Sequence, residues 1–85
     1  MMYKYKVDDS NIGYIFESFH EKKYGAELAE EAAYNYYVEN NNKTGNWPKI
    51  IHLYLNEECE FIGSFTVHLD FDPSFYAEFS SERIK

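Results

Sequence analysis

Residues 49–71 read KIIHLYLNEECEFIGSFTVHLDF, and this stretch decides the fold. Apolar residues recur at every second position on both sides of an acidic centre, a pattern typical of two strands that each bury one face. The residues expected to face inward are Ile51, Leu53, Leu55, Phe61, Phe65, Val67, Leu69 and Phe71. We therefore predict a β-hairpin whose two strands share one buried face.

The register of this hairpin follows from the numbering of its inward residues, which are all odd. Antiparallel pairing that keeps them on one face places Leu55 opposite Phe61 and Ile51 opposite Phe65. The connection is then a loop of about three to five residues centred on Glu58. A two-residue turn is excluded, because it would turn one apolar row to solvent.

Gly63 interrupts the inward row of the second strand and falls opposite Leu53 in this register. A glycine at such a position leaves room for a bulky group, which could be a helix side chain or Trp47. It can equally mark a β-bulge, and the sequence leaves both interpretations open.

Other segments of the chain also carry periodic patterns. Residues 2–7 alternate apolar residues with lysines and predict a strand, whereas Ala26–Asn40 places apolar residues and glutamates on opposite sides of a helix. Alternation at Phe75, Ala77 and Phe79 predicts a short last strand. Residues 12–24 have apolar spacings that fit a helix but include a glycine, so we expect an irregular or briefly helical lead-in.

These elements predict an α+β fold in which one main helix packs on one face of a small antiparallel sheet of three to four strands. The expected order is β-α-β-β, with the last short strand as a fourth. A chain of 85 residues is long enough for one hydrophobic core, so we expect a single domain over residues 1–85.

The formal charge is −7 and the sequence pI is near 4.8. Lys and Arg contacts to phosphates supply most non-specific affinity for nucleic acids, so we expect a basic protein surface as partner and no direct nucleic-acid binding. The start MMYKYKVDD lacks the apolar segment of a secretory signal, and the single cysteine, Cys59, fits a reducing compartment. We expect a cytoplasmic protein that does not enter membranes.

Carboxylates gather in the second half of the chain, where residues 50–82 contain no Lys or Arg. We predict a partner-binding surface that combines acidic residues with an outward-facing tyrosine. Its candidates are Glu57, Glu58, Glu60, Asp70 and Asp72 around the hairpin, Glu27, Glu30 and Glu31 on the helix, and Tyr54. At least one of Tyr34, Tyr36 and Tyr37 should also be exposed, because one helix cannot bury all three. The alternative is that the charges serve solubility alone.

Candidate chemistry is sparse. His68, Asp70 and Asp72 would point the same way from a strand, but such neighbours lie roughly 7 Å apart. They cannot all reach a zinc ion at about 2.0–2.2 Å without a bend. Acidic neighbours of Cys59 disfavour its thiolate, and His20 beside carboxylates is too common an arrangement to indicate catalysis. We therefore expect no metal, no cofactor and no enzymatic activity.

The segments LAEEAAYNYY, NWPKI, FIGSFTV and DPSFYA, between residues 26 and 79, together resemble small accessory proteins of phages and mobile elements. Their shared features are an AEEAA-type helix, a Trp-Pro before the next strand and an IG-x-F-x-V strand. Some small acidic proteins of this kind inhibit host defences, including CRISPR effectors and restriction enzymes. The resemblance implies a stoichiometric inhibitor of a host nucleic-acid-handling complex, acting in the cytoplasm of a bacterial host. The alternative is a self-associating assembly protein, for example a homodimer formed through a sheet edge or the face of Tyr54.

Overall fold

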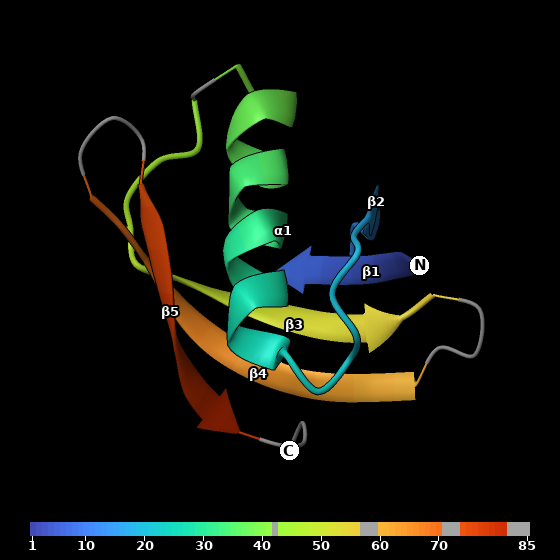
Figure 1. Ribbon diagram of the computed structural model, residues 1–85. Helices are drawn as coiled ribbons and strands as arrows, with labels where there is room; N and C mark the ends of the chain where they lie inside the picture. The colour runs from blue at the N-terminus through green and yellow to red at the C-terminus, as the bar shows by residue number, and fades with distance from the viewer. Residues whose placement is uncertain (42, 57–59, 71–73, 82–85) are drawn as a thin grey trace.

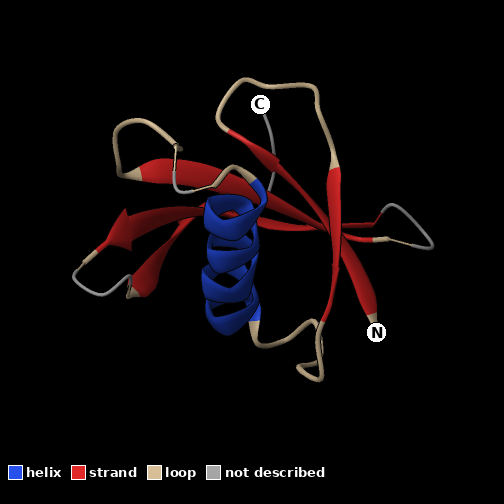
Figure 2. Ribbon diagram, turned by 90° about the horizontal axis from the view of Figure 1, so that it is seen from above, coloured by secondary structure: helices blue, strands red, loops and turns tan. Residues whose placement is uncertain are grey.

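The computed structural model describes residues 1–41, 43–56, 60–70 and 74–81. These residues form five strands and one helix: β1 (Met2–Val7), β2 (Tyr14–Glu17), α1 (Gly25–Glu39), β3 (Lys49–Leu55), β4 (Glu60–Leu69) and β5 (Phe75–Ser81). The strands make one sheet in the order β2-β1-β3-β4-β5, with every neighbouring pair antiparallel. The helix lies across one face of this twisted sheet (Figures 1 and 2).

The predicted α+β class is confirmed, but the described sheet has five strands rather than three to four. The additional strand is β2, in the segment expected to be irregular or briefly helical. It pairs with β1 through Tyr3↔Phe16 and Tyr5↔Tyr14. Within this segment Phe16 is buried while Ile15 is exposed, so the side chains follow the period of a strand and not that of a helix.

The N-terminal strand β1 lies between β2 and β3 and supplies two fully buried tyrosines, Tyr3 and Tyr5. The Tyr3 hydroxyl donates to the backbone oxygen of His20 at 2.7 Å, and the Tyr5 hydroxyl donates to Oδ1 of Asn35 at 2.6 Å. Burial raises the pKa of both phenols. A buried hydroxyl needs such a partner, and these two bonds tie β1 to the loop before α1 and to α1 itself.

The helix packs on the sheet through small residues. Its buried residues are Leu28, Ala29, Ala32 and Ala33. Because alanine side chains are short, the helix axis can approach the sheet closely and leave volume for the tyrosine rings of β1. The observed limits, Gly25 to Glu39, agree with the predicted helix within one residue at each end.

Asparagine residues end the helix. Asn40 donates to the Tyr36 oxygen through its backbone nitrogen at 3.1 Å and through Nδ2 at 2.8 Å. Asn41 then adopts a φ of 54°, in the left-handed region. Asn tolerates this conformation better than most residues, and the backbone therefore leaves the helix at this point.

The β3–β4 register is confirmed for Ile51↔Phe65 and Leu53↔Gly63, but not for the residues beyond them. The pairing shifts between Leu53 and Tyr54, so Leu55 lies opposite Glu60 and not opposite Phe61 as predicted. Ile62 is the extra residue of this β-bulge. As a result Phe61 faces away from the helix, on the same side of the sheet as Tyr54.

The space beside Gly63 is filled by aromatic rings of the sheet itself. A methyl group on Gly63 would lie 3.2 Å from Phe65 and 3.4 Å from Phe79. The three heavy atoms nearest to that methyl position belong to Phe65 and Phe79, and none belongs to Trp47 or to a helix side chain. Trp47 packs instead against Phe75, with ring centroids 5.2 Å apart. Gly63 therefore accommodates neighbouring phenylalanines and adjoins the bulge.

Carboxylates satisfy backbone donors beyond the regular ladders. Oε2 of Glu30 accepts a hydrogen bond from the Ala77 nitrogen at 3.1 Å, in the outermost strand β5. Oδ1 of Asp8 accepts one from the Ile50 nitrogen at 2.8 Å, just past the end of the β1–β3 ladder. Unpaired strand groups are templates for association with another chain, and these bonds remove two of them.

Candidate functional site

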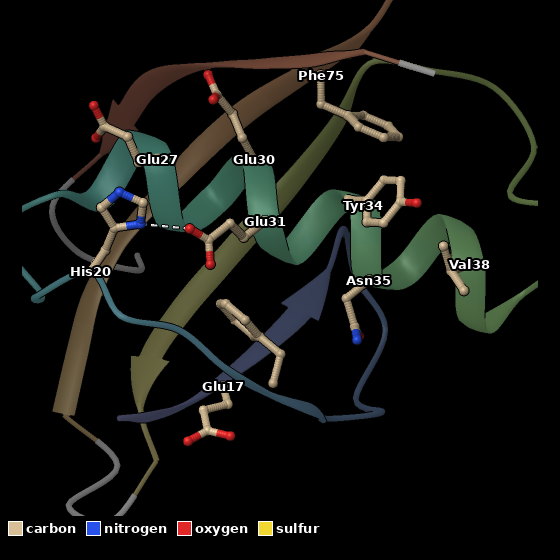
Figure 3. Close-up of a pocket in the computed structure, with 10 residues that line it drawn as sticks. Glu17, His20, Glu27, Glu30, Glu31, Tyr34, Asn35, Val38 and Phe75 are labelled. Carbon is tan, nitrogen blue, oxygen red and sulfur yellow. Dashed lines mark hydrogen bonds and ion pairs between the residues drawn. The ribbon is translucent and has the colours of Figure 1, made fainter. Parts of the chain in front are cut away.

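One side of α1 carries residues at helical spacing that are exposed or half-buried. We call this surface the acidic stripe; it consists of Glu27, Glu30, Glu31, Tyr34 and Val38. Tyr34 and Val38 are both exposed despite their apolar area, and Figure 3 shows the five side chains on one length of the helix. The prediction that at least one helix tyrosine is exposed is confirmed by Tyr34.

A hollow of about 630 Å³ lies along the acidic stripe. Phe16 of β2 and Phe75 of β5 reach it from the two outer strands, while His20 lines it near the start of the helix. Of the described residues that line it, none is Lys or Arg. A hollow with several carboxylates, aromatic rings and no cation of fixed charge favours positively charged groups over negative ones.

The three glutamates of the acidic stripe have different partners. Glu31 Oε2 lies 2.5 Å from Nδ1 of His20, and Glu30 caps the Ala77 nitrogen. Glu27 is exposed and makes no hydrogen bond or ion pair with any residue that the structure describes. Glu27 is therefore the glutamate that can contact an external cation without breaking an internal bond.

His20 also lies near Ser18, which raises the question of a nucleophile. Ser18 Oγ is 3.5 Å from Nδ1 of His20, the same nitrogen that contacts Glu31. A catalytic triad requires the hydroxyl on one ring nitrogen and the carboxylate on the other. Ser18 is also buried and accepts the His20 backbone N–H at 3.0 Å, so this cluster connects a loop to α1 and does not activate a nucleophile.

The hairpin candidates do not join the acidic stripe as far as the structure describes them. Glu57, Glu58 and Asp72 lie outside the described residues, as does Cys59. Glu60 accepts hydrogen bonds from Lys22 at 2.9 and 3.1 Å. Residues 50–82 contain no Lys or Arg, so the positive partner of Glu60 comes from the loop before α1.

Asp70 lies at the other end of β4, one residue past the strand. Its carboxylate is on an exposed residue, and its backbone nitrogen donates to Ser74 at 2.6 Å. Asp70 lies ten residue steps from Glu60, about 33 Å along a straight strand at 3.3 Å per residue. Of the predicted acidic residues within the described chain, only the three helix glutamates are brought together.

Tyr54 faces away from α1, as predicted, and therefore lies on the opposite side of the molecule from the acidic stripe. Its ring contacts Phe61 with centroids 5.4 Å apart, and Lys6 Nζ lies 5.9 Å from its ring centroid. Burial raises the pKa of its hydroxyl. Tyr54 and the helix glutamates, which the sequence analysis combined in one binding surface, thus belong to two separate surfaces.

The row His68, Asp70 and Asp72 is not continuous, because β4 ends at Leu69. His68 stacks on Tyr76 with centroids 4.7 Å apart, and its Nε2 lies 3.5 Å from Glu78 Oε1. Within the described ranges no three His, Cys, Asp or Glu side chains are placed to hold a metal ion. The contacts of His68 are those of a surface side chain packed on its cross-strand neighbour.

Comparison with known proteins gives no match to a family model, to a curated protein or to a solved structure. Among the described residues, α1 with its 15 residues is too short and too polar to cross a bilayer. Sequence reasoning did not include Val38 in the site, although its spacing of four residues from Tyr34 places both on one side of a helix. Nothing in the local sequence indicates that Phe75 and His20 reach the same hollow.

Proposed function

We propose that the protein is a non-catalytic binding protein whose acidic stripe docks on a basic surface of a partner protein. The observation that carries this proposal is the grouping of Glu27, Glu30 and Glu31 with exposed Tyr34 and Val38 around a hollow. Apolar and aromatic groups provide contact area, while carboxylates provide electrostatic steering and specificity.

The contacts within the acidic stripe support a surface that is ordered before binding. Glu30 and Glu31 are held by Ala77 and His20, so their carboxylates lose little side-chain freedom when a partner approaches. Glu27 provides a further carboxylate without an internal partner in the described chain. A Lys or Arg of the partner would then contact Glu27, while apolar groups of the partner cover Tyr34 and Val38 further along the helix.

In its more specific form, the proposal is that the partner is a nucleic-acid-handling defence complex of a bacterial host, of the CRISPR or restriction type. The protein would block it stoichiometrically, in the host cytoplasm, as an acidic surface occupying a groove that normally receives nucleic acid. The formal charge of −7 and the resemblance of residues 26–79 to phage and mobile-element accessory proteins support this form.

The test compares two charge reversals on the same helix. Glu27→Lys changes the acidic stripe, whereas Glu39→Lys makes the same change at an exposed residue that does not line the hollow. Tagged wild type and both variants are used to capture partners from a nuclease-treated lysate of the bacterial host, with quantification by mass spectrometry. The dissociation constant of the purified captured complex is then measured at two salt concentrations.

We expect Glu27→Lys to weaken binding at least about tenfold, because it replaces attraction to a desolvated cation by repulsion. Glu39→Lys should change affinity by less than about threefold and act mainly through the association rate. Equal effects of the two variants would overturn the role of the acidic stripe. A partner that keeps its full activity when saturated with the protein would overturn the inhibitor form while leaving the binding role intact.

A further inference from the structure

The sheet face that points away from α1 is more apolar than a solvated face should be. In an antiparallel sheet covered on one side, residues on the other side are normally polar. Here Ile15 is 52% exposed, Ile50 is 40% exposed and Tyr76 is 48% exposed. Alternation along β2, β3 and β5 places all three on this outer sheet face, opposite the buried Phe16 and Ile51.

The formal charges that the described strands place on the outer sheet face cancel. In the described strands, the residues of this face include Lys4 and Lys6 of β1, Glu17 of β2 and Glu78 of β5. The chain as a whole carries −7, whereas these four side chains sum to zero. Two copies repel each other through their net charge, and strands whose outward charges sum to zero add nothing further to this repulsion.

The aromatic groups of this face are already ordered by mutual contacts. Tyr54 packs against Phe61, and His68 stacks on Tyr76 with an interplanar angle of 14°. Rings held in this way lose little conformational freedom when another surface covers them. By contrast, the outermost strand β5 has its Ala77 nitrogen occupied by Glu30, which disfavours association by strand pairing at that point.

The dimensions of the molecule limit how large an interface this face can form. The two longest extents are 32 and 26 Å, so one sheet face covers at most about 800 Å². A standard stable interface buries about 800 Å² on each partner. A dimer through this face therefore has enough area when the full face takes part, with the two sheets packed face to face.

We propose that the outer sheet face binds a second copy of this chain, giving a two-fold symmetric dimer. In such a dimer Ile50, on the central strand β3, lies near the middle of the contact, with Ile15 and Tyr76 on the two outermost strands, β2 and β5. The acidic stripes of both copies remain exposed on the two outer sides. This inference goes beyond the proposed function, since it concerns the opposite face and does not require any other partner.

Sedimentation velocity of the full chain over a wide concentration range tests the dimer. We expect a species of about twice 10.1 kDa for wild type. Ile50→Lys should raise the dimer dissociation constant at least about tenfold, because each substitution enters a symmetric interface twice. Ile12→Lys is the matched control, since it introduces the same lysine at an isoleucine that is 61% exposed and lies between β1 and β2, outside the strands.

Circular dichroism establishes that each variant is folded, and Ile15→Lys replaces Ile50→Lys should the latter fail to fold. A wild-type monomer at every concentration would overturn the dimer, and so would a dimer lost in Ile12→Lys but kept in both sheet variants. Fluorescence anisotropy with a labelled single-stranded thymidine oligonucleotide measures whether the outer sheet face binds nucleic acid instead. Binding of the oligonucleotide by monomers, lost in Ile50→Lys, would assign this face to nucleic acid and overturn the dimer as well.

Discussion

Gly25→Ala is expected to destabilise the protein, because the ring of Phe65 occupies the space where a side chain would begin. A methyl group on Gly25 would lie 2.5 Å from Cζ of Phe65. Carbon atoms in contact are about 3.5–4.0 Å apart, so the ring or the first turn of α1 must move by roughly 1 Å. Phe65 is buried and also packs against Phe79 with centroids 5.5 Å apart, which limits this movement.

Overpacking of this kind costs about 1–3 kcal/mol. Part of the loss is offset, because replacing a glycine reduces the entropy of the unfolded chain by about 0.4–1 kcal/mol. The free energy of unfolding should therefore fall by about 1–2 kcal/mol. With a urea dependence of about 1 kcal/mol per molar for a chain of this size, the midpoint should fall by about 1–2 M.

Urea unfolding followed by circular dichroism measures this change in Gly25→Ala, in Phe65→Leu and in the double variant. The smaller leucine should remove most of the clash, so the loss caused by the alanine should shrink in that background. Gly13→Ala is the control, since a methyl group there meets only the flexible side chain of Lys4, 3.3 Å away at its nearest. An undiminished loss in the Phe65→Leu background, or no loss at all in Gly25→Ala, would refute the steric argument.

Three other consequences of the structure can be measured in single variants. Burial raises the pKa of Tyr5 above its ordinary 10.0, so this tyrosine ionises in the unfolded chain before it ionises in the folded protein. The free energy of unfolding therefore keeps its full value below about pH 10 and falls above it by up to about 1.4 kcal/mol per pH unit. Tyr5→Phe should reduce this alkaline loss in urea titrations, and an unchanged slope would contradict the burial argument. Glu30→Ala should speed hydrogen exchange at the Ala77 amide, whereas Glu30→Gln keeps an acceptor and should retain protection; equal exchange in both would rule out the cap. Asn41→Ala should lower the free energy of unfolding by about 1 kcal/mol, because a φ of 54° is unfavourable for alanine, while Asn41→Gly should leave it unchanged. Equal melting temperatures of the two variants in thermal unfolding would contradict this expectation.

The sequence predicted the parts of the fold that depend on local periodicity. Alternation in residues 2–7 and 75–79 identified two strands, and the odd-numbered row fixed Ile51↔Phe65 and Leu53↔Gly63. It could not locate the register shift beyond Leu53, because a bulge changes which residues pair without changing their composition. Strand β2 was missed because its four residues are set by pairing with β1, and only one of its apolar side chains, Phe16, is buried.

The candidate site shows the same division between local and distant information. Helical spacing alone groups Glu27, Glu30 and Glu31, and the structure keeps them together. The absence of Lys and Arg from residues 50–82 gave a wrong impression of an unpaired acidic hairpin at Glu60, because Lys22 reaches it from 38 residues earlier in the chain. Charge in a linear window does not predict charge at a folded surface when such long-range pairs form.

The inner place of β1 in the sheet has a consequence for how the chain folds during synthesis. Its pairing with β3 joins Lys4 to Tyr54, so the two sides of that ladder are made about 50 residues apart. A nascent chain can form the β1–β2 hairpin early, but Tyr3 and Tyr5 stay uncovered until α1 and β3 have left the ribosome. Closing so long a loop carries an entropic cost before any contact compensates for it. We therefore expect folding to be limited by this late long-range pairing, and to be slow for a domain of this size.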